Sequence, residues 1–369
     1  MHDIPAKPLR WQAFIGSLTV ILLSVALGLA NLDFASEPAP PAGGQSAASP
    51  ELERARSLTA SGRLDAAAAV YRRILAADPS SFEANFELGQ VDISQQKLEE
   101  ARKHLKTAAD LRPGVAVVHA RLAQVLLVMN ELEEGEKELL TAARLDPKEI
   151  SVRYNLGRLH EHQGRDADAL KEYLAFLELA PDDSRANNIR SRVALYYENS
   201  GNLDGAEQFY KALLERDPKR ASAHFGLANV YYRRTQYEDA LPRYQSVIAL
   251  DPNNSAAFAN IGFILRSKGM LKEAIENYKR SVDLDPASVS PRYFLGMLYA
   301  DTGEDDRALA EFQRIVEQEP EHPQVHYAIG KLYVKKGDRD AAQREFDLHR
   351  KIQAEERKKQ TTPTTMDDN

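Results

Sequence analysis

Histidine and carboxylate side chains are the groups in this sequence best suited to bind a metal or to transfer protons. The chain has 9 histidines and 55 acidic residues, and its densest histidine group is His160-Glu161-His162. Residues two positions apart on a helix point in different directions, whereas zinc sites on helices usually place two histidines four residues apart. We therefore expect no metal site in this segment, and no cofactor.

Other groups that carry out catalysis are scarce. The 369 residues include no cysteine, which excludes thiol nucleophiles, thiolate metal sites and disulfides. The pair Gly43-Gly44 does not follow a predicted strand, so it does not indicate a phosphate-binding loop. The net charge of −7 argues against nucleic-acid binding, which normally needs a basic surface. The composition predicts a protein that is not an enzyme and does not bind nucleic acid.

One long apolar segment lies near the N-terminus. Residues 11–32, from Trp11 to Leu32, carry no charge and are rich in Leu, Val, Ile and Ala. A helix needs about 20 such residues to cross the hydrocarbon core of a membrane. Two interpretations remain: an uncleaved signal-anchor helix, or a signal peptide that is cleaved near Gly28-Leu29-Ala30. We expect the anchor, because a signal peptide needs a shorter apolar stretch.

The charges around this segment predict its orientation. Lys7 and Arg10 precede it, and the first basic residue after it is Arg54. Basic flanks stay in the cytoplasm, so residues 1–10 are expected to be cytoplasmic and the bulk of the chain to lie outside the cytoplasm. Residues 33–50, which are rich in Pro, Ala and Gly, are predicted to be a flexible linker.

A 34-residue repeat fills the remainder of the chain. Eight copies carry a proline near their end, a ninth copy lacks it, and successive prolines are separated by 34, 34, 34, 37, 34, 34 and 34 residues. These prolines are Pro79, Pro113, Pro147, Pro181, Pro218, Pro252, Pro286 and Pro320. If the proline is counted as place 32, Ala or Gly stands at places 8 and 20, and an aromatic residue or Leu stands at place 24. The three extra residues are 184–186.

Each recurring residue type has a structural reason. Small residues allow two helices to approach closely, and the large residue at place 24 lies on the same helical face as the small residue at place 20. Proline ends the second helix because it cannot continue the hydrogen-bond ladder. The repeat therefore predicts helical hairpins that bury their apolar faces only by packing on the neighbouring hairpin.

These recurring places resemble those of the tetratricopeptide repeat (TPR) family, over nine units within residues 51–356. The resemblance implies an all-α fold, a right-handed α-solenoid of about nine TPR hairpins, here preceded by one transmembrane or signal helix and followed by a polar tail at 357–369. The family's tryptophan at place 4 is missing. Place 4 instead holds Asn85, His119, Arg153, Arg190, His224, Phe258, Arg292 and His326. We expect its three histidines to pack between helices.

The resemblance also implies that the first helix of each hairpin lines a concave groove, through places 2, 5, 9, 12 and 13. Places 2, 5, 9 and 12 share one helical face because they are three or four residues apart. Many of them hold aromatic, basic or amide side chains, which are common in protein recognition. The candidate partner-binding residues are Phe86, Tyr154, Arg158, Phe225, Asn229, Tyr232, Arg233, Phe263, Arg266, Tyr293, Tyr327 and Lys331. The alternative is that the aromatic side chains pack between neighbouring first helices.

We therefore hypothesise a non-catalytic, membrane-tethered scaffold that binds a protein or peptide in its groove. The layout is similar to that of bacterial envelope members of the family, which implies a single-pass protein of the bacterial inner membrane whose repeats face the periplasm or cell exterior and take part in complex assembly. One alternative is a cleaved, soluble periplasmic adaptor. Another is an accessory subunit that binds glycan or cell-wall polymer by stacking on Tyr154, Tyr232, Phe263 and Tyr293. A third is the repeat region of a larger enzyme.

Overall fold

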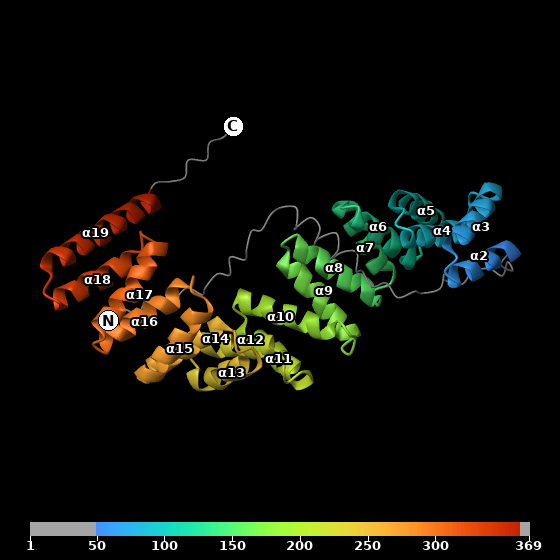
Figure 1. The fold of residues 1–369 in the computed structure, drawn as a ribbon. Helices are drawn as coiled ribbons and strands as arrows, with labels where there is room; N and C mark the ends of the chain where they lie inside the picture. The colour runs from blue at the N-terminus through green and yellow to red at the C-terminus, as the bar shows by residue number, and fades with distance from the viewer. Residues whose placement is uncertain (1–48, 362–369) are drawn as a thin grey trace. The chain divides into compact units, whose positions relative to one another are not determined.

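The structure, a computed structural model, describes residues 49–361, and every regular element in this range is an α-helix. The order of the eighteen helices is shown in Figure 1. They are α2 (Pro50–Ala60), α3 (Leu64–Ala77), α4 (Phe82–Ser94), α5 (Leu98–Leu111), α6 (Ala116–Val128), α7 (Leu132–Leu145), α8 (Ile150–His162), α9 (Asp166–Leu179), α10 (Ala186–Ser200), α11 (Leu203–Arg216), α12 (Ala221–Arg233), α13 (Tyr237–Leu250), α14 (Ser255–Ser267), α15 (Leu271–Leu284), α16 (Val289–Asp301), α17 (Asp305–Gln318), α18 (Pro323–Lys335) and α19 (Arg339–Thr361).

The helices follow the predicted repeat. The even-numbered helices α2 to α8 and α12 to α18 are first helices, and each packs against the odd-numbered second helix that follows it. Second helices in turn pack against the first helix of the next hairpin, as α3 does against α4 and α13 against α14. This arrangement confirms the predicted all-helical solenoid of TPR type.

Several predicted boundaries concern residues at the chain ends. The predicted cytoplasmic segment, apolar helix and linker, at residues 1–10, 11–32 and 33–50, lie almost wholly outside the described residues. No helix within 49–361 combines the length and the apolar character that crossing a membrane requires. The last helix, α19, continues past residue 356 to Thr361.

The first helices end at residues with a left-handed backbone. The repeat supplies glycine at most of these places, for example Gly164 with a φ of 70° and Gly269 with a φ of 76°. In three hairpins Gln96, Asn130 and Thr235 adopt a φ of 58°, 65° and 59° instead. A β-branched residue such as threonine rarely adopts this conformation. The hairpin turn therefore persists even where the sequence lacks the residue that suits it best.

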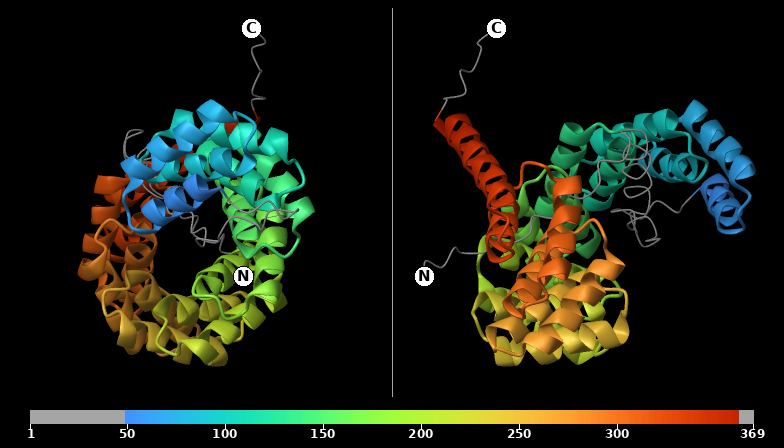
Figure 2. Two further views of the ribbon diagram at one scale, coloured as in Figure 1. Left: turned by 90° about the vertical axis from the view of Figure 1, so that its right-hand side faces the viewer. Right: turned by 60° about the vertical axis from the view of Figure 1, so that its left-hand side comes forward.

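The chain divides into two compact units, up to Ile189 and from Arg190, which are described separately. In the first unit, three successive apolar clusters are each built by three consecutive helices: α2 to α4, α4 to α6, and α6 to α8. Helix α4 serves two clusters, since Leu88 belongs to the first and Phe86 to the second. In the second unit one core continues from Ala194 to Leu332. Figure 2 shows both units from two further directions.

The small residues at places 8 and 20 have the predicted role in packing. A Cβ atom added to Gly157 on α8 would lie 2.6 Å from a ring carbon of Tyr173 on α9, closer than side-chain atoms normally approach. Ala169 and Tyr173 are both fully buried. The aromatic ring at place 24 thus occupies the space that the missing side chain leaves.

Polar side chains at place 4 replace the family's tryptophan in a consistent way. The side chain of Arg292 donates to the carbonyl oxygen of Pro286 at 2.8 Å and to Oε2 of Glu311 at 2.7 Å. His119 makes the same two kinds of contact, with the Pro113 carbonyl at 3.0 Å and Oε2 of Glu138 at 2.5 Å. We call this arrangement the place-4 clamp. It joins the end of one hairpin to both helices of the next.

The clamp recurs in Arg153 and His326, whereas His224 reaches only the carbonyl of Pro218. His119, His224 and His326 are all buried, as expected for packing residues. Within residues 49–361, no group of three or more acidic and histidine residues is placed to hold a metal ion.

The clamp at His119 predicts a pH-dependent contribution to stability. Both ring nitrogens face acceptors, so the doubly protonated imidazolium fits best, and the hydrogen bond to Glu138 raises the pKa of His119 above its ordinary value. This contribution is complete below about pH 6.5 and is lost as the pH rises through the folded-state pKa. We expect His119→Gln to lower the urea midpoint more at about pH 5.5 than at about pH 8.5.

His224→Gln is the matched control. His224 occupies the same place, but place 23 of its hairpin holds Arg243 rather than a carboxylate. Its replacement should lower the midpoint by a similar amount at both pH values. A difference between wild type and His119→Gln that grows with rising pH would contradict the assignment.

Candidate partner-binding face

We define the first-helix face as places 2, 5, 9, 12 and 13 of the first helices, within each unit. In Figure 1, α10, α12 and α14 run along one side of the second unit and α11, α13 and α15 along the other. Side chains at these places either pack on the second helices or remain accessible, and the structure separates the two groups.

In the first unit, Phe86 is fully buried in the cluster of α4 to α6, where its ring stacks on Phe82 with centroids 6.0 Å apart. It is not available to a partner, so we correct its assignment as a candidate. Tyr154 is half-buried against Phe176, at 6.0 Å between ring centroids. The guanidinium of Arg158 lies 5.8 Å from the Tyr154 ring centroid.

The remaining nine candidates lie in the second unit, and Phe225, Asn229 and Arg233 are engaged in contacts around Tyr244 and Glu198. Phe225 packs edge-on against Tyr244, with centroids 5.7 Å apart. The amide of Asn229 accepts the hydroxyl of Tyr244 at 2.7 Å and donates to Oε1 of Glu198 at 3.4 Å. Asn229 therefore has both ends of its side chain occupied, rather than being open for the backbone of a peptide.

Glu198 on α10 is the centre of this internal network. Its Oε2 accepts the hydroxyl of Tyr210 at 2.8 Å, and its backbone carbonyl accepts from the candidate Arg233. Burial raises the pKa of Glu198, and the hydrogen bonds from Tyr210 and Asn229 oppose that shift. The polar groups in this part of the first-helix face are thus largely hydrogen-bonded to one another.

Further along the second unit, aromatic rings gather across α12, α13, α14 and α16. Ring centroids are 5.3 Å apart for Tyr232 and Phe263, 6.4 Å for Phe263 and Phe294, and 5.8 Å for Tyr293 and Phe294. Tyr237 contacts Tyr232 at 5.8 Å. We call these five residues the aromatic cluster. All five are half-buried, so their rings support the core and still reach the surface.

Arg266 lies against this cluster. Its Cζ is 4.5 Å from the Phe294 ring centroid and 5.5 Å from that of Phe263, within the range of cation–π attraction. Among the described residues, no carboxylate forms an ion pair with it. Burial raises the pKa of Tyr232 to about 12, and the positive charge of Arg266 acts in the opposite direction.

Tyr327 and Lys331 lie on α18, at the far end of the second unit. Tyr327 is 48% exposed, and its ring contacts Phe346 and His349 of α19 at 5.8 and 5.4 Å. The Nζ atom of Lys331 lies 5.9 Å from the Tyr327 ring centroid. Both residues are therefore accessible, as the sequence predicts for a partner-binding surface.

The sequence pattern does not predict two members of the aromatic cluster. Phe294 stands at place 6 and Tyr237 at place 17, and neither place belongs to the expected face. The adjacent pair Tyr293-Phe294 is the one sequence signal for a larger aromatic surface.

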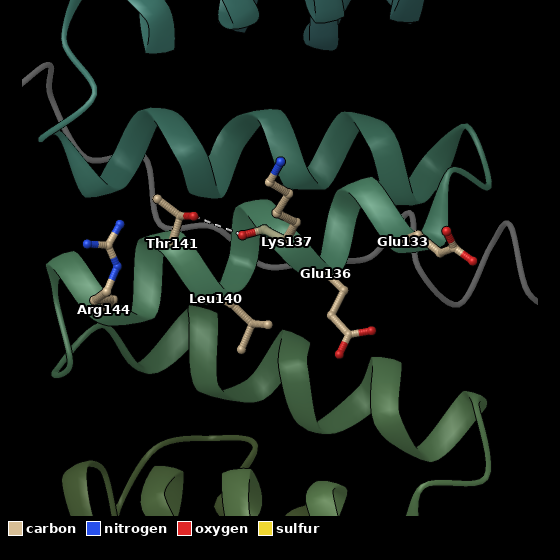
Figure 3. Close-up of a pocket in the computed structure, with 6 residues that line it drawn as sticks. All are labelled: Glu133, Glu136, Lys137, Leu140, Thr141 and Arg144. Carbon is tan, nitrogen blue, oxygen red and sulfur yellow. Dashed lines mark hydrogen bonds between the residues drawn. The ribbon is translucent and has the colours of Figure 1, made fainter.

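A separate depression lies along α7 in the first unit. It is lined by Glu133, Glu136, Lys137, Leu140, Thr141 and Arg144. Figure 3 shows that all six side chains come from this one helix and spread along its surface. Because no second element encloses it, the depression is a weaker candidate than the aromatic cluster.

The described repeats match sequence models of the TPR family. Sequence models described as tetratricopeptide repeat match residues 52–116 and 150–183, and another of that description matches 92–152, 199–261, 265–332 and 306–358. The last of these models alone covers more than half of the chain. No curated protein matches the sequence.

One solved structure shares the fold, and two others are similar over about half of this chain. The C-terminal part of a TPR repeat-containing protein from Cytophaga hutchinsonii is 15% identical, with a TM-score of 0.52 over 65% of this chain and 97% of that one. YrrB, described as a TPR protein with an unusual peptide-binding site, is 27% identical, with a TM-score of 0.45 over 50% of this chain and 94% of its own. MamA from Desulfovibrio magneticus RS-1 is 21% identical, with a TM-score of 0.43 over 47% and 96%.

The internal network predicts the effect of removing single hydroxyl groups. Tyr210→Phe removes a donor to a carboxylate, and we expect it to lower the free energy of unfolding by about 1.5–3 kcal/mol. Tyr244→Phe removes a donor to a neutral amide and should cost about 0.5–1.5 kcal/mol. Urea unfolding followed by circular dichroism measures both. Midpoints equal to that of wild type would show that the network does not stabilise the second unit.

Proposed function

Because the chain belongs to the tetratricopeptide repeat family, we propose that it is a non-catalytic scaffold that binds a protein or peptide on the first-helix face of its second unit. The observation that carries this proposal is the aromatic cluster with Arg266. Aromatic and arginine side chains supply much of the binding energy in protein interfaces. Here they come from the three successive first helices α12, α14 and α16 and from the start of α13, and they remain partly accessible.

The arrangement of the rings favours a protein partner over a glycan. A sugar that stacks on an aromatic residue needs an open ring face. Phe263 instead meets Tyr232 and Phe294 at interplanar angles of 65° and 74°, and the guanidinium of Arg266 lies over both phenylalanine rings. A surface of ring edges with one cation suits the mixed apolar and acidic side chains of a protein segment.

We also propose that residues 11–32 anchor the chain in a bacterial inner membrane and that residues 33–50 act as a spacer. The support is the 22-residue uncharged segment and the basic residues Lys7 and Arg10 before it. The repeats would then face the periplasm or the cell exterior and bring envelope proteins together. A cleaved, soluble adaptor has the same binding face without the anchor.

Photo-crosslinking tests the binding face. A photoreactive amino acid at Leu195 or Tyr327, which lie on the first-helix face and are 51% and 48% exposed, should give covalent adducts with other proteins in cells. The same amino acid at Leu179 or Leu250, on second helices and 39% and 40% exposed, is the matched control. We expect adducts from the first pair only. Equal adducts from all four positions would overturn the proposal.

Membrane extraction tests the anchor. The full-length chain should stay in the membrane pellet at alkaline pH, and its intact mass should include residues 1–32. Replacing residues 11–32 by a cleavable secretory signal should release the repeats in soluble form. A mature chain that lacks about 30 N-terminal residues would establish the cleaved form instead.

A further inference from the structure

The tyrosines at place 24 follow a rule. Their rings are buried, and their hydroxyl groups reach an acceptor on a first helix. Tyr173 and Tyr210 donate to the carboxylates of Glu161 and Glu198, at place 12 of their own hairpins, at 2.9 and 2.8 Å. Tyr244 donates to the amide oxygen of Asn229 at 2.7 Å. A buried hydroxyl needs such a partner because its desolvation is otherwise uncompensated.

Tyr278 breaks this rule. It is 1% exposed, and its buried hydroxyl has no hydrogen-bond partner among the described residues. Its ring stacks on Phe294, with centroids 5.8 Å apart. Place 12 of its hairpin holds Arg266 where Glu161 and Glu198 stand in the fourth and fifth hairpins. Arginine has only donors, so the acceptor of those hairpins is replaced by a second donor.

Other donors surround the same point. Tyr232, Tyr278 and Tyr293 each contact one of the two phenylalanine rings over which the Arg266 guanidinium lies: Tyr232 contacts Phe263, and Tyr278 and Tyr293 contact Phe294. No described side chain accepts a hydrogen bond from Arg266, Tyr232 or Tyr293. Four side chains that carry N–H or O–H donors, on α12, α14, α15 and α16, therefore lie around these two rings, and no described carboxylate, carbonyl or amide oxygen accepts a hydrogen bond from them.

We propose that Arg266 and Tyr278 bind the carboxylate of an aspartate or glutamate side chain in an extended segment of a protein partner. This inference rests on the proposed function and names the chemistry of the partner. A carboxylate supplies the acceptors that the guanidinium and the orphan hydroxyl lack, and arginine binds it with two parallel hydrogen bonds. Phe263 and Phe294 hold the guanidinium in place, which reduces the entropy lost on binding.

The surroundings favour a side-chain carboxylate over a chain terminus. Aromatic residues lie on both sides of Arg266, with Tyr232 and Tyr237 towards α12 and Tyr293 towards α16. A segment that contacts both sides continues past Arg266 in both directions. A carboxylate also carries one charge, and its desolvation among half-buried rings costs less than that of a doubly charged phosphate.

Peptide display tests the inference. A random peptide library, fused at its C-terminus so that no free terminal carboxylate is present, is selected on the immobilised full-length protein. We expect the retained peptides to be enriched in Asp or Glu beside apolar residues. Selection on Arg266→Gln should lose the acidic enrichment. Selection on Arg280→Gln, which alters an exposed arginine on α15 of the same hairpin, should keep it.

A double-mutant cycle then assigns the contact. For one selected peptide, Glu→Gln should weaken binding to wild type about tenfold or more, and should have little further effect on binding to Arg266→Gln. Tyr278→Phe should weaken binding about two- to tenfold. Its urea midpoint should not fall below that of wild type, in contrast to Tyr244→Phe, because it removes a hydroxyl without a partner.

The outcomes separate the two proposals. Retained peptides without acidic preference, or acidic enrichment that persists with Arg266→Gln, would overturn the carboxylate site and leave the binding function intact. No retained peptide on wild type would overturn both. A lower urea midpoint for Tyr278→Phe, with unchanged peptide affinity, would show that the hydroxyl has a structural partner.

Discussion

The packing of each hairpin on the next determines which side chains in each unit are buried and which remain exposed for binding. A first helix buries one side against its own second helix and another against the hairpin that precedes or follows it, as α4 shows by serving two apolar clusters. The place-4 clamp adds polar contacts to the same junction. Only a narrow strip of an interior first helix such as α4 remains exposed, and a binding surface on these helices has to be assembled from such strips.

This constraint explains why few of the polar groups near the strip are open to a partner. The carboxylate of Glu198 and the amide of Asn229 lie where groove residues are expected, yet they accept the hydroxyls of buried tyrosines. A buried tyrosine ring fills the space between helices, and its hydroxyl must then find an acceptor nearby. Polar groups that the sequence analysis assigns to partner binding are thus used for hydrogen bonds that stabilise the core.

The sequence predicted the architecture well, because the repeat period, the small residues at places 8 and 20 and the turn residues all depend on local geometry. It predicted the site less well. Helical spacing shows which side of a helix a residue occupies, but not how deep that side is covered, so Phe86 was assigned to the surface although it is fully buried. Asn229 was assigned to a partner although Tyr244 and Glu198 occupy its amide. Phe294 and Tyr278 were missed because their importance arises from contacts between hairpins.

Tyr210 and Tyr278 show how a different residue at one place of the repeat decides whether a buried tyrosine hydroxyl finds a hydrogen-bond acceptor within the protein. Both rings occupy place 24. The Tyr210 hydroxyl donates to Glu198 at place 12, whereas the hairpin of Tyr278 holds Arg266 at that place. A glutamate there completes the network within the protein, whereas an arginine leaves the hydroxyl without an acceptor. An unsatisfied buried hydroxyl costs about 1–3 kcal/mol of stability. Natural sequences accept such local conflicts chiefly at functional sites, where binding restores what folding leaves unsatisfied. The unsatisfied hydroxyl of Tyr278, near the Arg266 that lies against the aromatic cluster, is therefore better explained by a partner's carboxylate than by the needs of the fold.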